Sequence, residues 1–330
     1  MRGSPMVSVV MPVYNGERHL PEAMESIRNQ TFHDYEFIII DDGSTDGSDL
    51  ILSQWGKADD RLRIYHQENK GVIASLNRGC QLAQGKYIAR MDADDVSAPE
   101  RFARQVHFMA GHPEIGILGT WITYIEEDGS PRGNWRMASE PGLIGWFLLF
   151  GTCLAHPSIM MRREVIERVG LYRREALHVE DYDLWVRAIA ITQLANLPEI
   201  LLQRRIRKVS ISSQYFSTQE QNVVRIMHST ITQLLGAETS LETIENLRRL
   251  AVGRSQGDPR VIQYLANLVI HMRAAYLKSI SPNREIVRGV NRDAGGKLFA
   301  LAASACRVSP WSGLRILLRA LSLNPRLLVR

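Results

Sequence analysis

Short apolar segments alternate with amphipathic ones over the first two hundred residues of the chain. Near-continuous apolar runs at residues 7–16, 35–40, 62–66, 87–89, 115–125 and 156–161 predict strands. The first run, which turn residues end, is typical of a strand buried on both faces. Helical spacing of apolar residues marks residues 17–30, 49–55 and 71–84, the segment from residue 100, and the part of 177–190 that follows Val179. From about residue 217 onward the pattern is helical to the end.

The alternation of strands and helices predicts an α/β domain with a mostly parallel sheet, over residues 1–210, followed by a mainly helical region over 211–330. Ligands of such sheets bind outside the carboxyl ends of the strands. We therefore expect that edge to bring together Pro12, Tyr14, Asp41, Asp42 and residues 92–95, which are far apart in the sequence.

The sequence Asp92-Ala93-Asp94-Asp95 places three carboxylates within four positions, directly after a predicted strand. Carboxylates this close repel one another, increasingly so as water is excluded. A hard divalent cation such as Mg²⁺ or Mn²⁺ removes that repulsion and also binds substrate phosphates. The alternative is a solvated acidic turn, because an isolated Asp-x-Asp is a weak pattern.

Charge is distributed unevenly along the 330 residues. The net charge is +5, but residues 204–330 hold 20 Lys and Arg against 7 Asp and Glu, while the remainder holds 20 against 28. The basic part favours an anionic partner, such as a membrane surface or a polyanionic polymer. No nucleic-acid-binding motif accompanies it, so we expect no nucleic-acid partner.

Features of composition limit the location of the protein. The three cysteines are widely separated, which indicates a reducing compartment and no structural zinc site. Residues 1–8 lack the apolar core of a signal peptide. Residues 141–161 hold no charged side chain, but their apolar part is shorter than the roughly 20 residues of a membrane span. We predict a buried helix, a turn and a strand there.

Five sequence features together resemble the family-two inverting GT-A glycosyltransferases. They are residues 7–15, residues 41–46, Asn69-Lys70-Gly71 with Asn77-Arg78-Gly79, residues 92–95, and Glu180-Asp181, in the order and spacing of that family. The resemblance covers residues 7–205. It implies a GT-A catalytic domain that transfers a sugar from a UDP-sugar with inversion, using Mn²⁺ or Mg²⁺.

On the donor side, the resemblance implies that Pro12 and Tyr14 line a uridine pocket; the alternatives are strand termination and a core aromatic. It assigns the uracil imide contact to Asp42, with Asp41 capping the turn that follows. Lys70 meets the diphosphate or base, or is a surface lysine. Asn77 belongs to the donor site or has a positional role.

For the metal, the resemblance assigns direct ligation to Asp94. Asp92 contacts the ribose or a metal-bound water, Asp95 supports the site or orients the donor sugar, and Ala93 lies within the same donor-binding stretch. His156 approaches the metal or is a satisfied core histidine. Arg90 contacts phosphate or pairs with Asp92.

For the reaction, an inverting single displacement needs a base on the face opposite the leaving group, and hence from a segment other than the metal ligands. The resemblance assigns that base to Asp181, with Glu180 positioning it or the acceptor. The alternative is that both residues only favour a helix N-terminus. Trp185, a few residues on, is expected to pack in the core.

The predicted function is transfer to a hydroxyl of a glycan or lipid-linked acceptor, in cell-surface polysaccharide biosynthesis. The alternative is a non-catalytic nucleotide-sugar-binding or scaffold subunit. Near the C-terminus one helical face gathers Trp311, Leu314, Leu317, Leu318 and Leu321. That face contacts an anionic membrane, packs on the catalytic domain or forms a homo-oligomer. We therefore expect a cytoplasmic protein at the inner face of the cell membrane.

Overall fold

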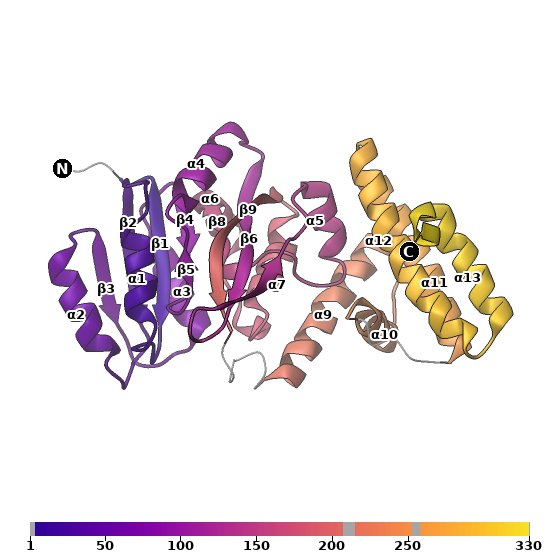
Figure 1. Ribbon diagram of the computed structural model, residues 1–330, viewed down its shortest axis with the longest axis horizontal. Coiled ribbons are helices and arrows are strands. Elements are labelled where there is room, and N and C mark those ends of the chain that lie inside the picture. The colour runs from indigo at the N-terminus through magenta and orange to yellow at the C-terminus, as the bar shows by residue number, and fades with distance from the viewer. Residues whose placement is uncertain (1–3, 207–214, 253–257, 330) are drawn as a thin grey trace. The chain divides into compact units, whose positions relative to one another are not determined.

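The computed structural model describes residues 4–206, 215–252 and 258–329 (Figure 1). The chain forms two compact units. The first comprises Met1–Pro141 and Thr152–Gln219, and the second comprises Gly142–Gly151 and Glu220–Arg330. The sequence division at residue 210 assigns residues 142–151 to the first part, whereas in the structure they belong to the helical unit.

The strands are β1 (Val7–Val13), β2 (Tyr35–Asp41), β3 (Leu62–His66), β4 (Tyr87–Arg90), β5 (Val96–Ser97), β6 (Ile115–Ile125), β7 (Pro131–Trp135), β8 (Met160–Arg162) and β9 (Gln193–Arg205). The α-helices are α1 (Leu20–Arg28), α2 (Ser48–Ala58), α3 (Val72–Leu82), α4 (Arg101–Gly111), α5 (Pro141–Phe147), α6 (Arg163–Val169), α7 (Glu180–Ala188), α9 (Phe216–Leu235), α10 (Leu241–Ala251), α11 (Pro259–Ser279), α12 (Arg284–Cys306) and α13 (Pro310–Leu323). Three 3₁₀ turns, η1 (His156–Ser158), η2 (Arg174–Ala176) and η3 (Pro325–Val329), complete the described elements.

One sheet runs through the first unit in the order β3-β2-β1-β4-β8-β6-β9-β5, with β7 paired to β6. The pairings among β3, β2, β1 and β4 are all parallel. Strand β8 joins β4 and β6 in antiparallel pairing, and β9 is parallel to β6. The expected α/β alternation with a mostly parallel sheet is confirmed. The crossover order places β1 between β2 and β4, so the ends of these three strands lie side by side.

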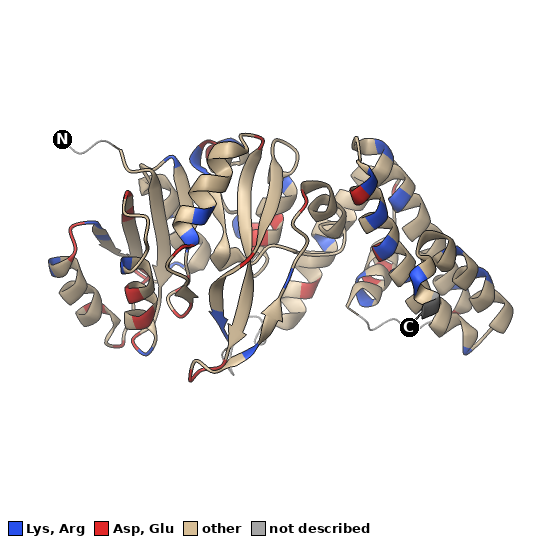
Figure 2. Ribbon diagram, turned by 45° about the horizontal axis from the view of Figure 1, so that its top comes forward, with Lys and Arg blue, Asp and Glu red and all other residues tan. Residues whose placement is uncertain are grey.

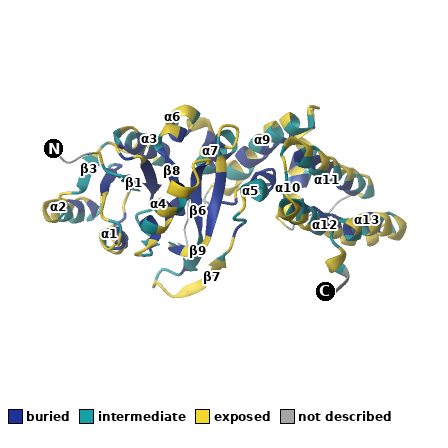
Figure 3. Cartoon of the chain, turned by 90° about the horizontal axis from the view of Figure 1, so that it is seen from above, coloured by how far each residue is buried: buried dark blue, intermediate teal, exposed yellow. Residues whose placement is uncertain are grey.

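The first strands are buried on both faces, as their continuous apolar runs predict. Val7, Val9 and Met11 of β1 pack in one core with helices α1 and α4, and Val10 faces α3 on the other side. Gly79 permits this close approach of α3, because a Cβ there would lie 2.4 Å from Val10 Cγ1. Figure 3 shows the dark, buried strands between more exposed helices.

Three strands were not predicted, and one predicted strand is different. Strand β9 escapes the pattern because Pro198 interrupts it, and its pairing with β6 shifts register around Trp121. Strand β5 has only two residues, and strand β7 has mostly exposed residues without an apolar run. The predicted strand at 156–161 begins instead as the 3₁₀ turn η1, and only Met160–Arg162 form β8.

The second unit is helical, as predicted for residues from 217 onward. Helices α11, α12 and α13 pack against one another through residues such as Val269, Leu298 and Ile316, all 1% exposed or less. The segment 142–151 lies in this unit, where Trp146 is fully buried. Among the described residues no helix is both long enough and apolar enough to traverse a bilayer.

Candidate active site

The carboxyl ends of the parallel strands β1, β2 and β3 are aligned. Val13 of β1 is paired with Asp41 of β2, and Asp41 with His66 of β3. The chain leaves β2 through Asp42, whose N–H donates to the Val13 carbonyl over 2.8 Å. This register brings the polar residues that follow each strand to the same edge of the sheet.

Asp42 is a buried carboxylate that organises the loop before α3. Its Oδ1 accepts hydrogen bonds from the Lys70 N–H at 2.9 Å and the Gln67 side chain at 2.7 Å, and its Oδ2 accepts from the Gly71 N–H at 2.8 Å. Gly71 adopts a φ of +84°, a conformation that favours glycine. Asp42 therefore shapes the loop that carries Lys70. A ligand that contacts Asp42 would do so in addition to these three hydrogen bonds.

The other predicted donor residues also lie at this edge. Asp41 is buried, and its Oδ1 accepts from the Ser44 N–H over 3.2 Å, as the predicted turn cap requires. Pro12 is half-buried, Lys70 is exposed, and Tyr14 is 52% exposed. The exposure of Tyr14 excludes the core-aromatic alternative and leaves its ring available to a ligand.

The acidic loop after β4 forms a compact carboxylate cluster. One oxygen from each of Asp92, Asp94 and Asp95 lies within 4.8 Å of the others. Burial, together with the charges of Asp92 and Asp94, raises the pKa of Asp95 well above its ordinary value. Its Oδ1 accepts from the Arg205 N–H, but its buried Oδ2 has no hydrogen-bond partner among the described residues. Three converging carboxylates with one unsatisfied buried oxygen fit a hard divalent cation.

Arg205, at the end of β9, holds this loop, and it was not among the predicted site residues. Its side chain is nearly buried and donates from Nε to the Asp94 carbonyl over 2.9 Å, and from Nη1 to the carbonyls of Glu126 and Glu127. Nη2 pairs with Glu22 of α1 over 2.6 Å. Only the pairing of β9 in the sheet brings Arg205 to the acidic loop, so no local pattern would have identified it.

Arg90 links the acidic loop to the second pair of carboxylates. It is 5% exposed and forms an ion pair with Asp92 through Nη1, as one of the two alternatives for it predicts. The charge of Arg90 lowers the pKa of both Glu180 and Asp181, whereas the charge of Asp92 raises the pKa of Glu180. The two carboxylate segments, almost ninety residues apart, therefore share one electrostatic environment.

Glu180 and Asp181 occupy the first turn of α7. Burial, followed by the charge of Asp181, raises the pKa of Glu180 to about 7, and its Oε2 is buried without a hydrogen-bond partner in the described part of the chain. Burial also raises the pKa of Asp181, although its Oδ1 accepts from the Tyr182 N–H over 2.7 Å. Raised carboxylate pKa values are typical of groups that exchange protons.

His156, for which approach to the metal and a satisfied core histidine were the two alternatives, lies outside the cluster of Asp92, Asp94 and Asp95. Its Nε2 shares a 2.9 Å hydrogen bond with the Tyr172 hydroxyl, and its ring contacts the buried Trp185. Burial and the charge of Arg90 lower its pKa well below the ordinary value. The structure therefore favours the satisfied core histidine, because its Nε2 already has a partner.

Asn77 has the positional role rather than an evident donor contact. Its Nδ2 donates to the Tyr172 carbonyl over 2.8 Å, and its Oδ1 accepts from the Tyr172 N–H over 2.9 Å. These reciprocal bonds fasten the segment before η2 to α3. Trp185 is fully buried, as expected for core packing.

The sequence of this chain is similar to a family profile and to known proteins. The profile of the family "Glycosyl transferase family 2" matches residues 8–170. EpsE of Bacillus subtilis (strain 168), which is named as a glycosyltransferase, is 40% identical over 193 residues, covering 57% of this chain and 68% of EpsE. The chain belongs to glycosyl transferase family 2. A second relative, the O-antigen biosynthesis glycosyltransferase WbnJ of Escherichia coli, is 33% identical over 210 residues, covering 62% of this chain and 81% of WbnJ.

The fold is likewise that of known glycosyltransferases. The crystal structure of residues 1–349 of TarS from S. aureus, in complex with UDP-GlcNAc, superposes with a TM-score of 0.58 at 15% identity, over 97% of this chain and 90% of that chain. The GT-A fold expected from the sequence is thus confirmed. At this edge of the sheet, the glycosyltransferase holds a metal-competent carboxylate cluster and a pair of carboxylates with raised pKa values.

Proposed function

We propose that this glycosyltransferase transfers a sugar from a UDP-sugar, with inversion, to a hydroxyl of a glycan or lipid-linked acceptor in cell-surface polysaccharide biosynthesis. The similarity to WbnJ supports a polysaccharide product. The observation that carries the proposal is the position of Arg90, which pairs with Asp92 and whose charge also lowers the pKa of Glu180 and Asp181. Donor activation and acceptor deprotonation need two such carboxylate groups close together but on different segments.

Asp181 is the proposed general base. As the acceptor oxygen attacks the anomeric carbon of the donor sugar, Asp181 takes the hydroxyl proton and the bond from that carbon to UDP breaks. Its burial favours this part, because the protonated product of the transfer is neutral. Glu180, one residue earlier, has a pKa that burial and the charge of Asp181 raise to about 7, and it shapes the acceptor side of the site.

The donor is held at the strand ends. The exposed ring of Tyr14, with Pro12, provides a surface for the uracil base, and the Asp42 carboxylate lies at the end of the neighbouring strand. Lys70, in the loop that Asp42 organises, faces solvent where a diphosphate enters. TarS, which has the same fold, binds UDP-GlcNAc, and this supports the choice of a UDP-sugar.

The divalent cation belongs to the acidic loop. Asp94 with Asp92 would hold it, and when bound it neutralises the charge that develops on the departing diphosphate. Asp95, anchored to the Arg205 N–H, supports their placement. Arg90 orients Asp92 through their ion pair and prevents its carboxylate from turning away.

The deciding experiment measures nucleotide release from a panel of UDP-sugars and GDP-mannose, each with Mn²⁺, Mg²⁺ or EDTA. We expect metal-dependent release from one UDP-sugar, lost in EDTA and in Asp94→Ala. The control variant Glu167→Ala, which removes an exposed carboxylate on α6, should keep the wild-type rate. Full activity in EDTA would exclude the metal role. No release from any donor, together with no UDP binding by calorimetry, would favour the non-catalytic scaffold.

A further inference from the structure

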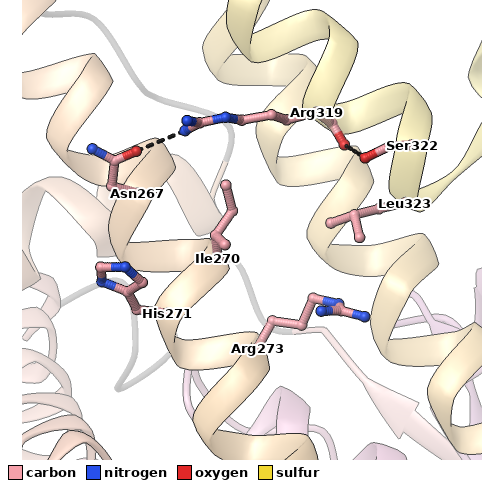
Figure 4. A pocket seen from close by; sticks show the side chains of 7 residues that line it. All are labelled: Asn267, Ile270, His271, Arg273, Arg319, Ser322 and Leu323. Atoms are coloured by element: carbon pink, nitrogen blue, oxygen red, sulfur yellow. Dashed lines mark hydrogen bonds between the residues drawn. The ribbon is translucent and has the colours of Figure 1, made fainter.

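A pocket of ≈ 340 Å³ lies between α11 and α13 in the second unit. Figure 4 shows two arginines that extend across it in opposite directions, Arg273 from α11 and Arg319 from α13. Ile270 and Leu323 provide the apolar part of its wall. The volume is within the range of small-molecule sites, so the pocket is large enough for a phosphorylated headgroup.

Both arginines are held by neutral amides rather than carboxylates. Arg319 Nη1 donates to Asn267 Oδ1 over 2.8 Å, and Arg273 Nε donates to Asn291 Oδ1 over 2.6 Å. In the part of the chain that the structure describes, neither guanidinium forms an ion pair. A guanidinium has five N–H donors, so each side chain is oriented by one bond while other donors remain for a ligand.

The surroundings of the pocket are strongly basic. Residues 260–329 carry 11 Lys and Arg against only Glu285 and Asp293, and Asp293 already pairs with Lys297 over 2.5 Å. Figure 2 shows this excess of basic residues on the helices of the second unit. His271 and Ser322 add polar groups to the pocket wall. Two forked cations with neutral hydrogen-bonding neighbours suit a phosphate group, which guanidinium binds in bidentate geometry.

An apolar stripe runs along α13 beside the pocket. Trp311 is 78% exposed, Leu318 59% and Leu314 43%, whereas α13 packs on its neighbours through a different face, including Ile316 and Ala320. The exposed positions are visible along α13 in Figure 3. A helix with exposed Trp and Leu beside arginines is typical of a bilayer interface.

We propose that the pocket between α11 and α13 binds a phosphate or diphosphate group, and that the group is the headgroup of an anionic lipid on which the α13 stripe lies. Arg273 and Arg319 contact the phosphate oxygens, while Trp311 and Leu318 enter the boundary between headgroups and acyl chains. The second unit alone forms this site. Its binding can therefore be measured without the sugar donor.

The test uses the 330-residue chain and two double variants with equal loss of charge. Arg273→Gln with Arg319→Gln removes the pocket cations, and Arg284→Gln with Arg288→Gln removes two exposed cations from α12. Flotation with phosphatidylglycerol vesicles, with phosphatidylcholine vesicles as reference, gives the vesicle affinity. We expect the pocket variant to bind phosphatidylglycerol at least about tenfold more weakly than the α12 variant, beyond the diffuse effect of charge. Equal losses would overturn the pocket as a site.

A second measurement separates the source of the phosphate. Measured in EDTA, which withholds the cation of the donor site, inorganic pyrophosphate should bind the wild type by calorimetry and compete with vesicles, and it should bind the pocket variant much more weakly. Trp311→Ser with Leu318→Ser should weaken vesicle flotation and leave pyrophosphate binding unchanged. Pyrophosphate binding without flotation would reject the lipid source and retain the phosphate site. Absence of both would reject the proposal, with thermal unfolding of each variant showing that it is folded.

Discussion

At the scale of single residues, the first turn of α7 holds two carboxylates whose pKa values are raised. Two adjacent carboxylates, Glu180 and Asp181, are placed where burial raises the pKa of each. A structural role at a helix N-terminus would need neither carboxylate to be withdrawn from water. Their environment therefore supports the catalytic alternative over the purely structural one.

Replacing Asp181 by Asn tests the proposed base. We expect the turnover rate to fall roughly 10²- to 10⁴-fold, because the amide cannot accept the hydroxyl proton, while UDP affinity stays unchanged. In the wild type the rate should fall on the acid side, since Asp181 must be deprotonated and its pKa is raised. Asp183→Asn, on the same helix but paired with Arg187, is the control. Wild-type turnover in Asp181→Asn would contradict the assignment.

Replacing Glu180 by Gln tests the raised pKa through stability. In the folded protein Glu180 holds its proton up to about pH 7, above its ordinary 4.5, so the free energy of unfolding falls as pH rises between these values. At pH 8 the variant should therefore be more stable than the wild type by about 1–3 kcal/mol, with little difference at pH 4.5. Thermal unfolding at both pH values measures this. An equal effect at both, or the same effect in the exposed Glu175→Gln, would argue against it.

At the scale of elements, the acidic loop is fixed from several directions by Arg205. The residue joins the end of β9 to the β4–β5 loop, to the turn after β6 and to α1. The fully buried Arg101 supports the end of β4, just before the acidic loop, by donating to the Arg90 carbonyl over 2.8 Å. The metal-competent carboxylates are therefore held by long-range contacts as well as by their own loop.

Arg205→Met is expected to lower the free energy of unfolding by about 2–4 kcal/mol, because three carbonyls lose a buried donor. It should also weaken Mn²⁺ affinity, since the Asp94 carbonyl loses the side-chain hydrogen bond that anchors the acidic loop. Denaturant unfolding and metal titration measure the two effects. Arg104→Met removes an exposed pair with Glu199 and should cost no more than about 1 kcal/mol. Similar costs for both variants would show that Arg205 has no special part.

At the scale of the whole molecule, the helical unit includes a segment from the middle of the chain. Within residues 142–151, Trp146 Nε1 donates to Asp293 over 2.6 Å, and its ring contacts Tyr276. The Phe150 carbonyl accepts from Arg248 over 3.0 Å. The C-terminal helices thus cover apolar side chains of a segment that precedes β8 in the sequence.

A chain shortened to residues 1–219 is therefore expected to aggregate, because Ile144, Trp146 and neighbouring apolar residues lose their cover. Its soluble yield and size-exclusion profile are compared with those of the 330-residue chain. Replacing Ile144 and Trp146 by Ser in the shortened chain should partly restore solubility. A monodisperse shortened chain with cooperative unfolding would show that the first unit does not need the helical region.

The pattern of the sequence determined the elements that depend on local order. Strands β1 to β4 have dense apolar runs, and helices α1, α3 and α7 have clear periodicity, so their place in an α/β fold followed directly. The polar residues after those strands then had to meet at one edge, because parallel strands share the direction of their ends. Asp41, Asp42 and the acidic loop were found in this way.

Only the tertiary structure decided the contacts that join distant segments. Strand β9 is interrupted by Pro198, and nothing near Arg205 in the sequence indicates that it anchors the Asp94 loop. The partner of His156 is likewise the Tyr172 hydroxyl, sixteen residues on, rather than the carboxylate cluster. Local patterns report which face of an element is buried; which side chain fills a given hydrogen bond depends on strand pairing and packing, and these are set by the chain as a whole.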